Sequence, residues 1–271
     1  MRGSTPCHGD DIARYGGNTS CVSVRADGER PLLFDLGTGL RYFANGLPVD
    51  EPFDGTALVS HLHWDHVQGL PFFSPLQHPD ARLVVYAPPQ DGERNAADYL
   101  TSSICPPMFP VGLDCFPGTI DIRDATPSFG VGGFDVRTVP VPHVGCSLGY
   151  RVDHGGRSVG YVSDHQQPLD GARIAPGVHE LLDGVDLLIH DAQYTPAEFA
   201  GKRDWGHCTV EYAVWLAARV GAARLALYHH DPSHDDDMLD RLAAMATECG
   251  RGLGVDVFAA YEGLSVDLSS P

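Results

Sequence analysis

The sequence predicts an α/β (α+β) fold in a single domain over residues 1–271, with strands gathered into two sheets and helices flanking them. Short apolar runs bounded by Pro or Gly recur along the chain, as buried strands do. Two later segments carry apolar residues at helical spacing. A chain of 271 residues can bury enough apolar surface for a two-sheet core. No internal repeat or linker divides it.

The expected elements cover most of the chain in order. Thr209 is the expected N-cap of a helix that Gly221 ends. A second helix is expected over residues 237–249, stopping at Gly250. A polar turn at residues 26–30 separates the first two strands. Strands are expected at 20–25, 32–36, 57–60, 82–87, 134–139, 148–152, 159–163, 187–189 and 225–228.

The composition excludes several function classes. A formal net charge of −18 opposes long polyanions, because nucleic-acid affinity rests largely on basic groups that neutralise phosphates. A pair of bound dications would offset part of this charge, so a small anionic substrate stays compatible with it. Seven cysteines without a Cys-x-x-Cys pair fit a reduced protein. Neither a membrane-spanning run nor a signal-peptide core is present, so we expect a cytoplasmic protein with no membrane partner.

The strongest chemical signal is the segment Val59-Ser-His-Leu-His-Trp-Asp-His-Val67, which follows an apolar run. His61, His63, Asp65 and His66 place four metal-capable side chains within six residues. Imidazole suits zinc and other late first-row ions, and carboxylate adds a hard anionic ligand. Burying such a cluster without a cation would leave several polar groups unpaired. The segment therefore predicts half of a metal site.

The spacing His-x-His-x-Asp-His resembles the signature of the metallo-β-lactamase fold superfamily. The resemblance implies a four-layer αβ/βα sandwich of two mixed β-sheets flanked by helices. It also implies two divalent metal ions. Zinc is favoured over manganese by the Irving–Williams order, and manganese and iron stay alternatives.

The same resemblance implies the remaining ligands from their order along the chain. His143 follows one expected strand, and Asp164 stands at the end of another. The last ligand is one of two adjacent histidines, which point in opposite directions on leaving a strand. His229 is favoured because it directly follows the apolar run, and His230 stays the alternative. The implied assignment gives His61, His63 and His143 to one ion and Asp65, His66 and His229 to the other, with Asp164 shared.

Two further segments resemble the phosphodiesterase branch of this superfamily, which includes ribonuclease Z and small cyclic phosphodiesterases. They are Leu187-Leu-Ile-His-Asp-Ala-Gln-Tyr194 and Trp205-Gly-His-Cys-Thr209. The likeness implies that His207 donates a proton to the leaving oxygen and that Asp191 orients it. That branch usually has Glu in place of Asp191 and Ser in place of Cys208, so the shorter carboxylate puts the His207 contact in question.

The amino terminus resembles a bacterial subgroup of cyclic-nucleotide phosphodiesterase-like hydrolases. Arg2-Gly-Ser-Thr-Pro6 and Tyr15-Gly-Gly-Asn-Thr-Ser-Cys-Val22 carry this likeness. Such proteins usually have a strand before Arg-Gly-Ser, and this chain begins at Met1 without it. Dimerisation is plausible by the same likeness, so we count a homodimer among the expectations.

Residues 88–121 are expected to form an insertion that serves as a lid or cleft wall. The insertion has only Arg94 as a basic residue, whereas ribonuclease Z grips tRNA with a basic arm. Its apolar stretch Ile104-Cys-Pro-Pro-Met-Phe-Pro-Val111 suits a nucleobase or, equally, ordinary loop packing. Long nucleic acid is therefore disfavoured as a partner.

These features together predict a dinuclear metal-dependent phosphodiesterase acting on a small diester, such as a cyclic nucleotide. The resemblance implies attack by a metal-bridging hydroxide, which forms from a water that Asp65 orients and deprotonates. Alternatives are a hydrolase of a lactone, thioester or lactam, or a noncatalytic metal- or ligand-binding protein on the same fold. An iron oxidoreductase is disfavoured because no flavodoxin-like domain follows.

Overall fold

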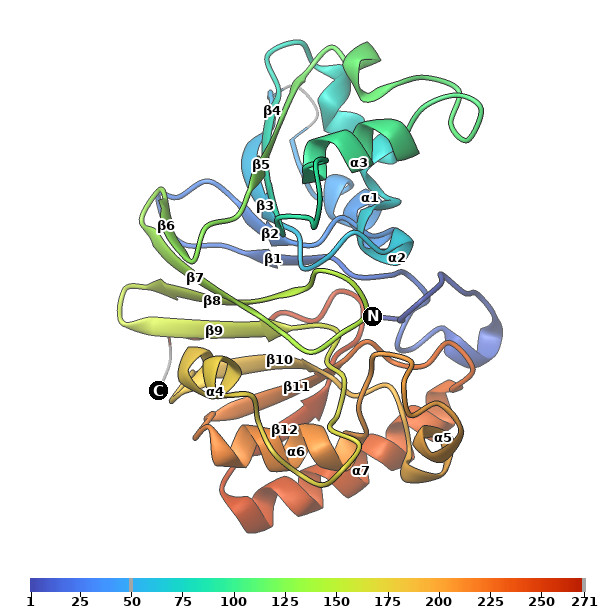
Figure 1. Cartoon of the computed structure of the whole chain (residues 1–271), viewed down its shortest axis with the longest axis vertical. Helices are drawn as coiled ribbons and strands as arrows, with labels where there is room; N and C mark the ends of the chain where they lie inside the picture. Colours follow the sequence, from blue (N-terminus) through green and yellow to red (C-terminus); the bar gives the residue numbers. More distant parts are fainter. Residues whose placement is uncertain (49–50, 270–271) are drawn as a thin grey trace. The chain divides into compact units, whose positions relative to one another are not determined.

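The computed structural model describes residues 1–48 and 51–269 and contains two mixed sheets flanked by helices, as predicted (Figure 1). It divides into two compact units. The first consists of Met1–Thr19 and Pro127–Pro271, and the second of Ser20–Thr126. No helix in the described part of the chain is long and apolar enough to cross a membrane.

The second unit is built on a five-stranded sheet in the order β1-β2-β3-β4-β5. The first pair of strands is antiparallel and the other pairs are parallel. Helices α1 (Gly39–Ala44), α2 (Trp64–Val67) and α3 (Ala96–Ser103) accompany the sheet, with short 3-10 turns at Leu70–Phe72, Ser74–Gln77 and Leu113–Cys115. The strands are β1 (Val22–Val24), β2 (Leu32–Phe34), β3 (Asp54–Leu58), β4 (Arg82–Ala87) and β5 (Thr119–Asp124).

One face of this sheet forms the core of the unit. Leu33, Val85 and other strand residues pack there against Leu40 of α1 and Leu100 of α3. Because β2 and β3 are parallel and pair Phe34 with Leu58, the residues that follow both strands emerge at the same sheet edge. That edge carries the histidine-rich segment.

The first unit is built on a seven-stranded sheet in the order β12-β11-β10-β9-β8-β7-β6. Strands β6 to β9 pair antiparallel, whereas β9 to β12 pair parallel. The strands are β6 (Ser128–Val131), β7 (Phe134–Pro140), β8 (Leu148–His154), β9 (Arg157–Val162), β10 (Leu187–Asp191), β11 (Arg224–Tyr228) and β12 (Asp256–Ala259).

Helices α4 (Pro176–Leu182), α6 (Val210–Arg219) and α7 (Asp236–Leu253) bury apolar side chains in the core of this unit, among them Leu181, Leu216 and Leu242. They pack with strand residues such as Leu188 and Leu225. The short α5 (Pro196–Gly201) and a 3-10 turn at Asp10–Ile12 complete the unit. The parallel strands β9, β10 and β11 end at one edge, which is where Asp164, Asp191 and His229 follow or close them.

Several predicted boundaries are shifted. Strand β3 spans Asp54–Leu58 rather than residues 57–60, and β1 spans Val22–Val24 rather than residues 20–25. Helix α7 continues past Gly250 to Leu253 and ends at Gly254, whose φ is 79°. Gly250 lies inside the helix. A Cβ at this position would stand 2.4 Å from Val257 Cγ2, so the glycine lets α7 approach β12 closely. The strand expected at residues 187–189 extends to Asp191, which pairs with Tyr228 of β11.

The segment expected to be a lid has structure of its own. It contains α3, the turn Leu113–Cys115 and the first residues of β5. Ile104 is fully buried in the core of the second unit, whereas Met108 is 83 % exposed. A lid function for residues 88–121 stays a prediction, as does a single domain over the whole chain.

Candidate metal centre

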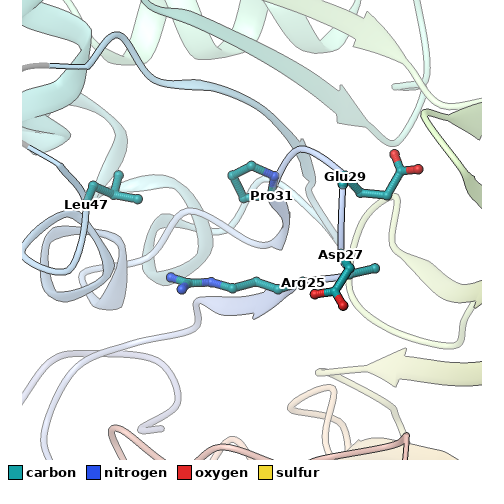
Figure 2. A pocket seen from close by; sticks show the side chains of 7 residues that line it. Arg25, Asp27, Glu29, Pro31 and Leu47 are labelled. Atoms are coloured by element: carbon teal, nitrogen blue, oxygen red, sulfur yellow. The ribbon is translucent and has the colours of Figure 1, made fainter.

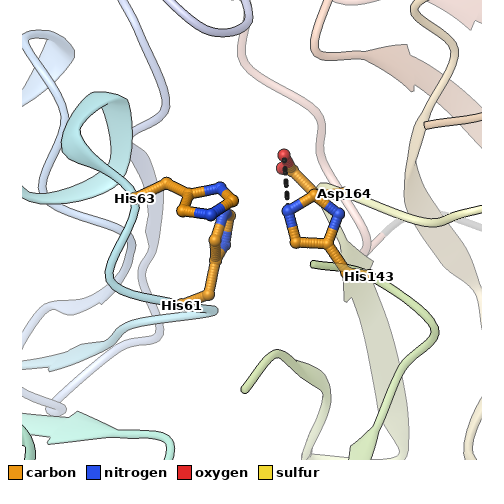
Figure 3. Close-up of side chains that lie close together, drawn as sticks. All are labelled: His61, His63, His143 and Asp164. Atoms are coloured by element: carbon orange, nitrogen blue, oxygen red, sulfur yellow. Dashed lines mark ion pairs between the residues drawn. The ribbon is translucent and has the colours of Figure 1, made fainter. Parts of the chain in front are cut away.

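The histidine-rich segment lies at the carboxyl end of β3 and runs into α2. His61, Asp65 and His66 are buried, and His63 is exposed. The His61 and His63 rings lie against each other with centroids 4.4 Å apart (Figure 3). His66 Nε2 is 3.1 Å from Asp65 Oδ2. The sequence cluster therefore folds into one compact group of ligand-type atoms.

Asp35 supports this group from the end of β2. Its carboxylate is fully buried and accepts hydrogen bonds from Ser60 N at 2.6 Å, Ser60 Oγ at 2.9 Å and His66 Nδ1 at 2.7 Å. Because the Ser60 hydroxyl donates its proton to Asp35, the Ser60 oxygen accepts a hydrogen bond from His61 Nδ1 at 3.0 Å. Asp35 thus fixes the orientation of two imidazoles.

The first unit holds a second group of ligand-type residues. Asp164, His207 and His229 each offer a ligand atom, and these atoms lie within 4.8 Å of one another. His229 Nε2 is 3.4 Å from Asp164 Oδ1, and His143 Nε2 is 3.8 Å from Asp164 Oδ2 (Figure 3). Asp164 is thus the common neighbour of His143, His207 and His229.

The hydrogen bonds of these imidazoles test whether the residues fit a metal. His143 Nδ1 donates to the Gly206 carbonyl at 2.8 Å, His229 Nδ1 to Gln193 Oε1 at 2.7 Å, and His66 Nδ1 to Asp35. With Nδ1 protonated, a neutral imidazole presents a lone pair at Nε2. In all three cases Nε2 faces a carboxylate oxygen. Two acceptors at such distances repel unless a proton or a cation lies between them, so both groups of residues fit divalent ions.

His207 and Asp191 form the contact that the sequence left in question. His207 Nδ1 is 2.9 Å from Asp191 Oδ2, so the shorter carboxylate does reach the ring. Asp191 is fully buried and also accepts from the backbone N–H groups of His165 at 3.0 Å and Gln193 at 2.9 Å. Its position at the end of β10 and these three donors hold the carboxylate in place.

Cys208 packs in the core beside Asp191. The thiol is fully buried and donates to the Asp191 carbonyl at 3.1 Å. Burial, with the nearby charge of Asp191, raises the pKa of Cys208 well above its usual range. The group therefore stays a neutral thiol, and no nucleophilic role follows from it.

Comparison with known proteins gives the family. Residues 30–230 match the family model described as the beta-lactamase superfamily domain. The chain belongs to this family. A ribonuclease Z of Natronomonas pharaonis is 26 % identical to it over 94 % of this chain and 93 % of that protein.

Solved structures share the fold of this beta-lactamase superfamily member. The metallo-β-lactamase fold protein YhfI of Bacillus subtilis has a TM-score of 0.70 at 18 % identity and covers 97 % of this chain and 94 % of that chain. Zinc-bound PqqB of Methylobacterium extorquens has a TM-score of 0.66 at 20 % identity, covering 93 % and 87 %. The protein is accordingly a metal-dependent hydrolase of the metallo-β-lactamase fold.

The two candidate last ligands have different surroundings. His229, with φ 56°, directs Nε2 toward Asp164. His230 instead places Nε2 2.9 Å from the Ala260 carbonyl. Burial lowers the pKa of His230 well below its usual range. These contacts favour His229, the histidine that the sequence preferred.

The residues that orient the candidate ligands were not predicted from the sequence. Asp35 and Gln193 orient His66 and His229, and the close approach of Gly206 to His143 leaves no room for a Cβ. An acidic residue directly after a buried strand was a usable signal for Asp35. Gln193 and Gly206 act across long sequence separations, so their partners are visible only in the fold.

A cavity elsewhere in the second unit lies beside the turn between β1 and β2. Arg25, Asp27, Glu29, Pro31 and Leu47 are among its lining residues (Figure 2). None of the predicted site residues lines it. The cavity therefore has no part in the candidate metal centre.

Proposed function

We propose that the protein is a dinuclear metal-dependent phosphodiesterase that hydrolyses a small phosphodiester, such as a cyclic nucleotide. The observation that carries the proposal is the His207–Asp191 contact of 2.9 Å beside Asp164 and His229. Phosphodiester cleavage expels an alkoxide, and a positioned general acid such as His207 would lower the barrier to its departure.

The proposed ligands follow the family order along the chain. His61, His63 and His143 would hold one ion, Asp65, His66 and His229 the other, and Asp164 both. Bound divalent ions would supply Lewis-acid stabilisation of the charge on the phosphoryl oxygens. Zinc is the ion we favour, since imidazole-rich sites suit it and the similar fold of PqqB was solved with zinc.

The protein side chains supply the proton transfers. Asp65 orients the attacking water and takes its proton. His207 gives a proton to the departing ester oxygen through Nε2, because Nδ1 is held by Asp191. Asp191 keeps the ring in this tautomer and stabilises the imidazolium before transfer. The products are a phosphomonoester and an alcohol, or one monoester if the substrate is cyclic.

The charges of the chain support a small substrate. Relatives named ribonuclease Z raise the possibility of RNA, yet the net charge is −18. Arg94, the basic residue of the insertion, lies over the Tyr99 ring at 4.3 Å and bonds to Ser102. Without a basic arm, binding of a long polyanion has little support. We propose a cytoplasmic enzyme for small diesters.

The test is the leaving-group dependence of His207→Ala. Loss of a general acid should cut turnover about 10²–10⁴-fold on alkyl diesters, whose leaving groups need a proton, and far less on nitrophenyl diesters. His179→Ala, an exposed histidine on α4 of the same unit, is the matched control. Metal content must be measured in parallel, because His207 is also close enough to Asp164 and His229 to be a ligand. Equal losses on both substrates, or loss of metal, would contradict the proton-donor role.

A further inference from the structure

The loop between α5 and α6 exposes a large aromatic ring close to the proposed proton donor. Trp205 is 61 % exposed and stands two residues before His207. Indole is large and mainly apolar, so leaving it in water forgoes the burial that stabilises most tryptophans. An exposed tryptophan beside a reacting group is a candidate for ligand contact.

The loop that carries Trp205 is firmly held. Gly206 N donates to Gln166 Oε1 at 2.8 Å, and the Gly206 carbonyl accepts from His143 Nδ1 at 2.8 Å. Trp205 N donates to the Lys202 carbonyl at 3.2 Å. The backbone is therefore held on both sides of the ring, on the Gly206 side by His143 itself. A ring presented in this way loses little entropy on binding a partner.

Lys202 orients the ring and sets the charge around it. Its Nζ lies 5.6 Å from the Trp205 ring centroid and 4.6 Å from that of Tyr194. The ammonium is also 3.0 Å from Asp231 Oδ2, so its charge is neutralised by that partner. Tyr194 in turn lies edge-on to the His207 ring at 5.7 Å. Tyr194 is buried, so the exposed indole of Trp205 is the aromatic surface here, and the ammonium beside it is already paired. Such a surface suits an uncharged planar group better than an anion.

We infer that Trp205 forms a leaving-group subsite, where its indole stacks on a planar aromatic ring, such as a nucleobase, of the alcohol that His207 releases. This rests on the proposed function. In the step, the bond from phosphorus to the alcohol oxygen breaks while a bond to the water oxygen forms. The departing oxygen takes the His207 proton, and the water proton goes to Asp65. Stacking on Trp205 places the departing oxygen near His207.

The experiment compares two diesters with the same nucleotide part in wild type and Trp205→Ala. One releases adenosine and the other releases methanol, and products are identified by chromatography. Because Trp205→Ala removes base–aromatic stacking, we expect its kcat/KM for the adenosine-releasing diester to fall about 5- to 150-fold. The methyl diester should change less than about twofold. Trp205→Phe should retain most of the activity, and Tyr42→Ala, an aromatic that is 57 % exposed on α1, should change neither.

A binding measurement separates this inference from the proposed function. Adenosine alone is titrated calorimetrically into wild type and Trp205→Ala, with no turnover required. Weaker binding by Trp205→Ala supports the subsite even if no diester is cleaved, in which case only the proposed function fails. Equal adenosine binding by the two proteins, or none by wild type, overturns the subsite. Equal losses on both diesters would also overturn it.

Discussion

Replacing Asp35 by Asn should weaken metal binding without removing any ligand. The carboxylate accepts from Ser60 N, Ser60 Oγ and His66 Nδ1 at 2.6, 2.9 and 2.7 Å. Asparagine keeps one acceptor oxygen and turns the other into an NH₂ donor. At least one buried donor then faces another donor, which costs about 1–3 kcal/mol. Because His66 and, through Ser60, His61 lose their orientation, metal affinity should fall about 10- to 100-fold.

The assay is competition of apo-protein with a fluorescent zinc chelator, paired with urea unfolding of the metal-free form. Asp27→Asn, an exposed aspartate on the turn between β1 and β2, is the control and should match wild type in both measurements. The reasoning would be refuted by Asp35→Asn binding zinc within about twofold of wild type while unfolding at the same urea concentration.

Two further predictions test the surroundings of the site. Gly206→Ala should displace His143 and lower bound metal, because its Cβ would lie 2.5 Å from the ring and φ is +94°. Gly28→Ala, at φ +79° with open space around it, is the control, and equal metal contents would count against the reasoning. Burial lowers the pKa of His230 well below 6.5, so the unfolded chain binds a proton that the folded chain rejects, and stability falls as pH drops below about 6.5. His230→Gln should lessen that fall in unfolding free energy by at most about 1.4 kcal/mol per pH unit. Thermal unfolding measured between pH 7.5 and 5 would contradict this if the variant's stability depended on pH as steeply as that of wild type.

The sequence predicted most of the sheets because their strands are continuous apolar runs that Pro, Gly or a polar ligand ends. The strand at residues 82–87 has the predicted bounds, and 225–228 differs only at its first residue. The edge strands β5, β6 and β12 were not predicted. β5 carries charged residues on its exposed positions, so it lacks the apolar run of a buried strand.

The end of α7 and the residues that orient the candidate ligands could not be predicted from local apolar runs. Gly250 looks like a helix stop by composition, but its role is close packing against Val257, which depends on tertiary structure. Asp35, likewise, acts on His66 from 31 residues away. Ligand types follow strand ends and can be found locally, whereas the groups that orient them come from other strands.

The central claim is that this member of the beta-lactamase superfamily is a two-metal phosphodiesterase. The most direct measurement is hydrolysis of bis(p-nitrophenyl) phosphate by purified protein that has been stripped with chelator and then restored with zinc or manganese. We expect no turnover in the stripped protein, and turnover that rises with added metal and saturates near two ions per chain. A folded protein that holds two ions and leaves the diester intact would contradict the claim.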